Sequence, residues 1–288
     1  MNEKIKKLEE YFEKREDTEM AFLFGSRAEK NRINEHSDWD IAVYLKSKDK
    51  KLERQSDANY TTQEEEIWNS LSNLLQTDNI DLIVLNRAYP TVADSALRGA
   101  PLVIKNRLLW LKFMLKITSE AIDFRKTAHE YYQIFMRSHS LNAQDAHELE
   151  RIIEFLKSEI KFLADFKNIL WVDYQEDRLR RNAMERSIEK LMNAIIDTAK
   201  IVLSSKHKPM PMSYREIIET VSIDSAFSKE IIERLSKWAE LRNILAHEYL
   251  DLRWNKIHDF LQNADTIFNS FIESAKKFLE ENREKENK

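Results

Sequence analysis

Two stretches of the chain, MAFLFGSRA at residues 20–28 and SDWDIAVYL at residues 37–45, decide the fold of its N-terminal part. Each contains an apolar run of strand length; the first run ends at Gly25, and the second follows Asp40. Short apolar runs that are bounded by glycine or by acidic residues are typical of buried β-strands. The sequence therefore predicts one strand that ends at Gly25 and a second strand that begins after Asp40.

Two further apolar runs, at residues 80–85 and 101–104, predict a third and a fourth strand. The segments between the runs have helical spacing, and short apolar runs that alternate with helices are typical of an α/β sheet. We therefore expect an N-terminal α/β domain.

Residue types also predict where the helices of this domain begin and end. Residues 61–75 have a helical pattern, with Thr62 as N-cap and Glu65 three residues later as its capping-box partner. Residues 90–98 suit a short helix that is closed by Gly99, because glycine is the usual residue after a helix C-terminus.

From residue 108 onward the apolar residues recur with a period of 3.6, which indicates helices only. A clear break comes at residues 140–142, where Asn142 is the predicted N-cap of the next helix. The domains are therefore expected at 1–140 and 141–288, and the fold class is α+β, an α/β domain followed by an all-α bundle. Helices are expected at about 107–138, 144–168, 177–205, 213–220, 226–249 and 254–283.

The composition of the 288-residue chain excludes several classes of site. The chain has only two glycines, 74 residues apart, so dinucleotide-binding, Walker A and G-x-S-x-G motifs are absent. It has no cysteine, which excludes disulfides, thiolate catalysis and cysteine zinc sites. The net charge is −4, and neither half is strongly basic, so any RNA-binding surface has to be local.

The sequence shows no targeting segment. The N-terminal residues MNEKIKK lack the apolar core of a signal peptide. The longest apolar stretch, residues 108–117, is interrupted by Lys112 and Lys116 and is too short to cross a bilayer. We therefore expect a cytoplasmic protein that does not contact a membrane.

Three aspartates and a Gly-Ser turn form the first candidate site. Residues i and i+2 of a strand share a face, which places Asp38 and Asp40 together at the start of the second strand, while Asp81 begins the third. An isolated aspartate at a strand start is usually a solvated cap. Three carboxylates on neighbouring strands, however, form an oxygen-rich pocket that suits Mg²⁺ and nucleotidyl transfer. Gly25 and Ser26 offer backbone N–H groups and a hydroxyl to a triphosphate, and Gly25 indicates a close backbone approach or a positive φ.

These residues resemble the minimal nucleotidyltransferases (MNT) of the polymerase-β superfamily over about residues 1–105. The resemblance implies that Gly25 and Ser26 bind the triphosphate of ATP and that Asp38 and Asp40 bind Mg²⁺. It further implies that Asp81, the third metal-binding carboxylate, helps to activate the acceptor hydroxyl. The chain departs from the family pattern in two ways: Lys30 stands where a glycine is usual, and eleven residues rather than ten separate the Gly-Ser turn from the first aspartate.

The sequence LRNILAHEY at residues 241–249 forms the second candidate site. Arginine and histidine suit metal-independent RNA cleavage, in which histidine moves a proton and arginine holds the phosphate. On a straight helix Arg242 and His247 are about 140° apart. A working pair therefore requires the helix to end near His247, or a cleft that wraps around it. An ordinary interpretation leaves Arg242 in solvent and His247 in an interface.

The spacing of these residues resembles the HEPN ribonucleases, in particular the HepT-like toxins, over about residues 143–283. Two supporting matches are RNAMER at residues 181–186 and SYRE at residues 213–216. The resemblance implies that Arg242 and His247 are the catalytic pair and that Asn243 supports them. It also implies that Tyr249 is the acceptor of AMP.

Together the two resemblances predict a fused toxin-antitoxin protein. The nucleotidyltransferase would use ATP and Mg²⁺ to place AMP on Tyr249 and so silence RNA cleavage, and a homodimer through the helical domain is expected. One alternative is an aminoglycoside-type nucleotidyltransferase whose helical bundle only helps to bind a small acceptor. A further alternative is a bundle that binds nucleotide or dimerises and has an inactive ribonuclease site.

Overall fold

The structure is a computed structural model of the chain, and it describes residues 2–28, 37–47, 52–54, 56, 58–137, 140–247 and 254–286. The chain divides into two compact units, Met1–Arg125 and Lys126–Lys288. The division falls inside one long helix, α4 (Arg107–Phe135), whereas the boundary expected from the sequence, at residue 140, lies after this helix. None of the described helices is long and apolar enough to cross a bilayer.

The first unit contains a four-stranded mixed sheet with the strand order β3-β2-β1-β4. Strand β1 pairs antiparallel with β2 and with β4, and β2 pairs parallel with β3. The four predicted strands and the α/β class of this unit are thereby confirmed. The bounds of the strands are β1 Thr18–Phe24, β2 Trp39–Leu45, β3 Ile80–Val84 and β4 Ala100–Ile104.

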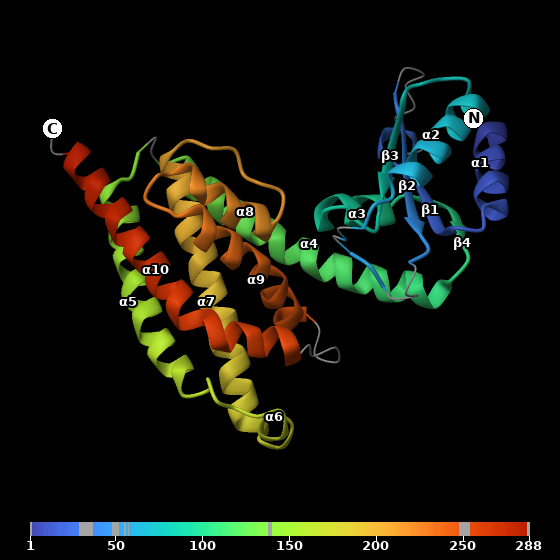
Figure 1. Cartoon of the computed structure of the whole chain (residues 1–288). Helices are drawn as coiled ribbons and strands as arrows, with labels where there is room; N and C mark the ends of the chain where they lie inside the picture. The colour runs from blue at the N-terminus through green and yellow to red at the C-terminus, as the bar shows by residue number, and fades with distance from the viewer. Residues whose placement is uncertain are drawn as a thin grey trace. The chain divides into compact units, whose positions relative to one another are not determined.

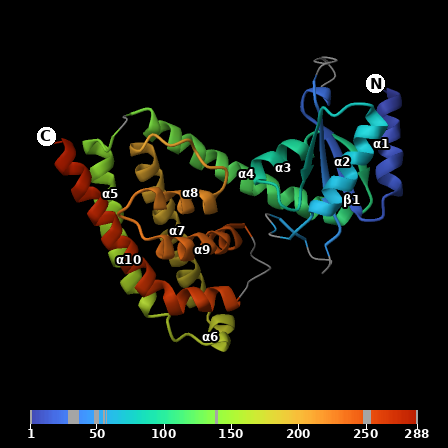
Figure 2. The same ribbon diagram turned by 45° about the horizontal axis from the view of Figure 1, so that its top comes forward.

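Helices cover both faces of this sheet (Figures 1 and 2). Helices α1 (Asn2–Lys14) and α2 (Thr61–Leu75) bury their apolar residues on one face. Helix α3 (Pro90–Leu97) and the first turns of α4 cover the other face. Alternate residues of β2 enter the two cores, Ile41 the first and Ala42 the second, because successive side chains of a strand point to opposite faces.

Two predicted helix ends differ from the structure. Thr62 is not the N-cap of α2, because the helix begins at Thr61 and Tyr60 occupies the N-cap position. The side chain of Asn59 accepts a hydrogen bond from the Thr61 backbone N–H at 2.9 Å, so it satisfies one of the free N–H groups of the first turn. Gly99 does follow the end of α3, directly after the C-cap residue Arg98, but it lacks the positive φ that such a glycine usually has. A Cβ at Gly99 would lie 2.3 Å from the carbonyl oxygen of Leu23, so close contact with β1 requires the glycine.

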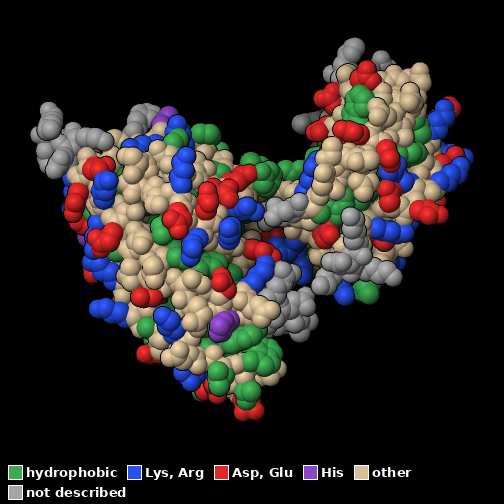
Figure 3. All heavy atoms as spheres, in the orientation of Figure 1, with side chains coloured by type: hydrophobic (Ala, Val, Ile, Leu, Met, Phe, Trp, Pro, Cys, Tyr) green, Lys and Arg blue, Asp and Glu red, His purple; other side chains and the backbone are tan. Residues whose placement is uncertain are grey.

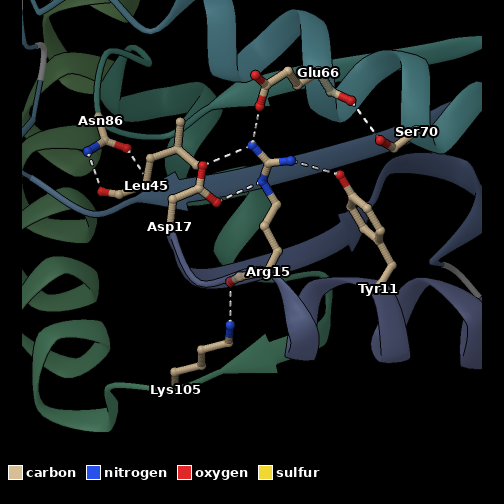
Figure 4. A network of polar contacts seen from close by, with 8 residues as sticks. All are labelled: Tyr11, Arg15, Asp17, Leu45, Glu66, Ser70, Asn86 and Lys105. Atoms are coloured by element: carbon tan, nitrogen blue, oxygen red, sulfur yellow. Dashed lines mark hydrogen bonds and ion pairs between the residues drawn. The ribbon is translucent and has the colours of Figure 1, made fainter.

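A polar network around Arg15 fixes the turn between α1 and β1 (Figure 4). The guanidinium donates to the Tyr11 hydroxyl at 3.2 Å, to Asp17 at 2.9 Å and to Glu66 of α2 at 3.1 Å. The Lys105 ammonium, at the end of β4, donates to the Arg15 carbonyl at 2.6 Å. Arg15 thereby connects α1 to α2 through its side chain, and the end of β4 through its backbone carbonyl.

Asp94 connects α3 to α4 through a buried carboxylate that is 1% exposed. It accepts hydrogen bonds from Arg125 at 2.6 Å, from Arg98 at 3.1 Å and from the Thr118 hydroxyl at 3.0 Å. Burial alone would raise the pKa of this carboxyl, but the hydrogen bonds from Arg125, Arg98 and Thr118 hold it below its ordinary value of 3.8.

We expect Asp94→Asn to lower the free energy of unfolding at pH 7 by about 1–3 kcal/mol, because it removes charge-assisted hydrogen bonds. A depressed pKa contributes stability above the pKa of the unfolded chain and loses it as the pH falls through the folded pKa. The difference between parent and variant should therefore shrink as the pH is lowered from 7 to about 3. Urea unfolding at several pH values measures this difference, and a gap that is independent of pH would contradict the assignment.

The second unit is all-helical among its described residues, as predicted. Asn142 caps α5 as expected, and its side chain accepts the Asp145 backbone N–H at 2.9 Å. Phenylalanines 260, 268, 271 and 278 line the buried side of the last helix. The helices are α5 Ala143–Ala164, α6 Trp171–Glu176, α7 Arg178–Ser205, α8 Tyr214–Thr220, α9 Lys229–His247 and α10 Trp254–Glu286.

The C-terminal part of α4 completes this bundle. The buried ammonium of Lys200 in α7 contacts Glu130 of α4 at 2.8 Å and Asp197 at 2.7 Å. The hydroxyl of Tyr131, which is fully buried, donates to the carbonyl of Lys208. These contacts explain why the division between the two units lies within α4.

Hydrophobic side chains gather on the surface of the second unit over α6 (Figure 3). The exposed fractions are 66% for Leu170, 42% for Trp171, 55% for Val172 and 83% for Leu179. An exposed apolar patch of this kind is a common property of surfaces that bind another molecule.

Candidate active sites

The Gly-Ser turn lies directly against one of the predicted acidic residues. It follows β1 as a short 3-10 helix, Gly25–Arg27. Gly25 has φ +66°, and a Cβ there would lie only 2.0 Å from Oδ2 of Asp40. Both reasons that the sequence suggested for a glycine, a positive φ and a close approach, therefore hold.

Two of the three candidate carboxylates are direct neighbours in the sheet. Asp40 in β2 and Asp81 in β3 are partners in the parallel register, so their side chains leave the same face. Ala42 and Ile83, which follow Asp40 and Asp81 by two residues and share their face of the sheet, pack with α3 and α4. The two carboxylates therefore leave the sheet on the side of α3 and α4. Asp38 lies just before β2, two residues from Asp40, and is exposed, as is Asp81.

The negative charges of Asp81 and Asp38 act on Asp40. The pKa of Asp40 is raised above 3.8, first by burial and then by the negative charges of Asp81 and Asp38, while the Arg27 guanidinium opposes the rise. A divalent cation would relieve this repulsion, and hard carboxylate oxygens are the ligands that Mg²⁺ prefers, so the donor set fits the ion. In the part of the chain that the structure describes, no three acidic or histidine side chains already converge on one metal position.

The second candidate site is built around a buried arginine. Arg242 in α9 is only 7% exposed, so the interpretation that left it in solvent is wrong. Its Nε–H donates to the Oδ1 atom of Asn193 in α7 at 3.0 Å. Its guanidinium carbon lies 4.7 Å from the ring centroid of Tyr214 at the start of α8.

Two further residues of this site, Asn243 and His247, lie on the same helix as Arg242. Asn243 is 7% exposed, and its Oδ1 atom has no hydrogen-bond partner among the described residues. Helix α9 is described as far as His247, so the expected helix end near this residue stays a prediction. The side chain of His247 and the whole of Tyr249 lie outside the described residues.

Comparison with known families assigns a family to each unit. Residues 6–108 match the polymerase beta nucleotidyltransferase family, and residues 146–275 match the family described as ribonuclease HepT-like. The chain is a polymerase-β-like nucleotidyltransferase domain fused to a HepT-like ribonuclease domain. No curated protein matches it. The nucleotidyltransferase match contains the residues of the first site, Gly25, Asp38, Asp40 and Asp81. The ribonuclease match contains Arg242, Asn243 and His247.

Arg27 of the nucleotidyltransferase domain was not singled out from the sequence. Its Nε–H donates to the carbonyl of Ser37 at 2.7 Å and to that of Asp38 at 3.1 Å. Its guanidinium carbon also lies 4.6 Å from the ring centroid of Trp39. The Arg27 side chain thus joins the Gly-Ser turn to the backbone at Asp38. In the sequence, the feature that points to Arg27 is its position directly after Ser26.

We expect Gly25→Ala to abolish nucleotidyl transfer and to lower the free energy of unfolding by about 1–3 kcal/mol. The added Cβ meets the Asp40 carboxylate, and alanine is strained at a φ of +66°. Urea unfolding and transfer of labelled nucleotide measure the two effects. As a control, Gly99→Ala disturbs β1 at the Leu23 carbonyl instead, so its loss of activity should follow its loss of stability. Full transfer by Gly25→Ala would contradict the proposed close approach.

The sequence also does not indicate that Tyr214 and Asn193 contact Arg242 in the ribonuclease domain. In the sequence, Tyr214 stands out only as part of the matching string SYRE, and no motif includes Asn193. No sequence pattern within one helix indicates them, because they approach Arg242 from α7 and α8.

Proposed function

We propose that this fusion is a self-silencing toxin-antitoxin protein. Its nucleotidyltransferase domain transfers AMP from ATP to Tyr249 of the ribonuclease domain, and the modification stops RNA cleavage. The observation that carries the proposal is that Asp40 of β2 pairs with Asp81 of β3 in the sheet. The Asp40 side chain also lies next to Gly25, and Asp38 is two residues before Asp40. This arrangement, in a chain that also carries the Arg242–His247 pair, offers both a transferase and its target.

In the transfer reaction, the Tyr249 oxygen would attack the α-phosphorus of ATP and pyrophosphate would leave. Asp38, Asp40 and Asp81 would hold Mg²⁺, which neutralises phosphate charge. Gly25 and Ser26 would bind the triphosphate, and Asp81 would help to remove the proton from the tyrosine hydroxyl.

In the ribonuclease domain, Arg242 would hold the scissile phosphate and stabilise the charge that develops on it. His247 would move the proton of the 2′-hydroxyl or of the leaving group, because imidazole titrates near neutral pH. Asn243 would support the pair. Its Oδ1 atom has no hydrogen-bond partner in the described part of the chain, which is consistent with a polar group that is kept for a ligand.

Silencing follows from the position of Tyr249 in the sequence. It follows His247, the last described residue of α9, by two residues in the sequence. An AMP group there adds a negative charge and a base next to the proposed phosphate site. The anion would compete with RNA for Arg242 and would block access to the pair.

We also propose a homodimer through the ribonuclease domain, in which both copies of Arg242 and His247 line one groove. The exposed apolar patch over α6 (Leu170, Trp171, Val172 and Leu179) supports a protein-binding surface on this domain. Light scattering at tens of micromolar chain should give the mass of a dimer, and a monomer would contradict this part of the proposal.

The alternative of a small-molecule nucleotidyltransferase does not require the spacing of Arg242, His247 and Tyr249. The family match of residues 146–275 to ribonucleases supports the toxin-antitoxin proposal over this alternative.

The experiment that tests the proposal is the intact mass of the chain after incubation with ATP and Mg²⁺. Each transferred AMP raises the mass by one fixed increment, and fragmentation should place the increment on Tyr249. An unchanged mass in a preparation that starts without AMP would overturn the proposed transfer.

A further inference from the structure

The guanidinium of Arg242 is held on two sides by residues from other helices. The Tyr214 ring covers one face of it, at 4.7 Å, and Asn193 accepts the Nε–H at 3.0 Å. Tyr214 is 6% exposed and Arg242 is 7% exposed, so the contact is largely removed from water. Cation–π attraction is stronger when the cation is desolvated. A contact to the face and another to one edge together fix the plane of the guanidinium.

Tyr214 is itself fixed at both ends. Its backbone is the first residue of α8, where the Ser213 side chain caps the helix by accepting the Glu216 backbone N–H at 3.2 Å. Its hydroxyl lies 3.0 Å from Oγ1 of Thr127 in α4, and Thr127 is 8% exposed. The ring therefore offers Arg242 a rigid surface.

A cleavage site that stabilises developing phosphate charge works best when its donors are already oriented before the reaction. Arginine has a long side chain, and holding it in one orientation has an entropic cost. A ring and an amide that hold the guanidinium beforehand remove this cost from the cleavage step.

We propose that Tyr214 and Asn193 are positioning residues of the ribonuclease, which orient Arg242 for the RNA phosphate, and that Thr127 orients Tyr214. The inference rests on the proposed role of Arg242 in RNA cleavage. The competing explanation is that these contacts only stabilise the bundle.

The first test measures RNA cleavage by the full chain carrying Asp38→Asn and Asp40→Asn, so that AMP transfer does not silence the parent. Tyr214→Leu removes the ring and should lower kcat about tenfold while KM changes about twofold or less. Tyr214→Phe keeps the ring and should retain most of kcat. Thr127→Val removes the partner hydroxyl, so combining it with Tyr214→Phe should add no further loss.

The matched control is Phe227→Leu, which removes a buried ring that packs on Phe271 and Phe278 in the same domain. A purely structural effect would lower activity equally in Phe227→Leu and Tyr214→Leu when their melting temperatures match. Equal kcat values in those two variants would overturn the inference.

The second test observes Arg242 directly, without RNA. In protein with ¹⁵N-labelled arginine, the Nε–H signal that disappears in Arg242→Lys belongs to this residue. The Tyr214 ring should shift that signal, and Tyr214→Leu should remove the shift while Tyr214→Phe keeps it. An unchanged signal in Tyr214→Leu would overturn the inference. If the parent cleaves no RNA, the proposed ribonuclease function is wrong, and so is the catalytic part of this inference. The Arg242 Nε–H signal would still decide whether Tyr214 holds Arg242.

Discussion

Replacing Asp38 and Asp40 together with asparagine is expected to abolish transfer of AMP to the chain, a loss of several orders of magnitude. Asparagine keeps the size of each side chain but removes the negative charge that would hold Mg²⁺. The loss should not come from unfolding. Burial and the charges of Asp81 and Asp38 raise the pKa of Asp40, so the charge on this side chain destabilises the folded chain relative to the unfolded chain. Neutral asparagine should therefore leave the melting temperature unchanged or raise it.

The control for this experiment removes the same charge elsewhere in the domain. Glu9→Gln with Glu10→Gln changes two exposed residues of α1, which covers the opposite face of the sheet from Asp40. That variant should transfer labelled AMP as the parent does. Undiminished labelling in the Asp38→Asn, Asp40→Asn variant would disprove the assignment of these carboxylates.

Tyr249→Phe is expected to release the ribonuclease and to slow the growth of cells that express the chain. Phenylalanine keeps the ring and removes only the acceptor oxygen, so the folded state should be preserved. The purified variant should show no mass increment from ATP and should cleave RNA that the modified parent leaves intact. Adding His247→Ala should cancel both the cleavage and the growth defect.

An exposed tyrosine elsewhere in the same domain provides the comparison. Tyr132 in α4 is 54% exposed, and Tyr132→Phe should remain modified and harmless. If the Tyr249→Phe chain is folded, unmodified and still harmless, the silencing mechanism is wrong, and the helical domain is better explained as a scaffold for the nucleotidyltransferase.

Much of the fold could be predicted from the sequence because its elements have clear periods. The helix predicted at 61–75 has those bounds in the structure, and the strand runs fall within one or two residues of the observed strands. Helix α6 was missed, because six residues are too few to show a helical period. It is held by tertiary contacts: Trp171 and Tyr174 pack on Trp254, at centroid distances of 5.6 and 4.9 Å.

The candidate sites were predictable to the extent that one element carries them. The spacing of Asp38 and Asp40 at the start of one strand is visible in the sequence, whereas the register that places Asp81 opposite Asp40 depends on strand pairing. Likewise, the arginine and histidine of α9 are evident from their spacing. The burial of Arg242 under Tyr214 results from packing between helices that no local pattern encodes.

The contribution of α4 to the ribonuclease bundle has a consequence for the lifetime of the ribonuclease domain after the chain is cut. Thr127, Glu130 and Tyr131 precede the segment that matches the ribonuclease family, yet they bind Tyr214, Lys200 and the Lys208 carbonyl. A protease that cut between the family-matched segments, after these residues, would release a bundle without its α4 partners. Because both domains belong to one polypeptide, they are made in a one-to-one ratio. A ribonuclease domain that outlived the nucleotidyltransferase domain would therefore have lost part of its own packing.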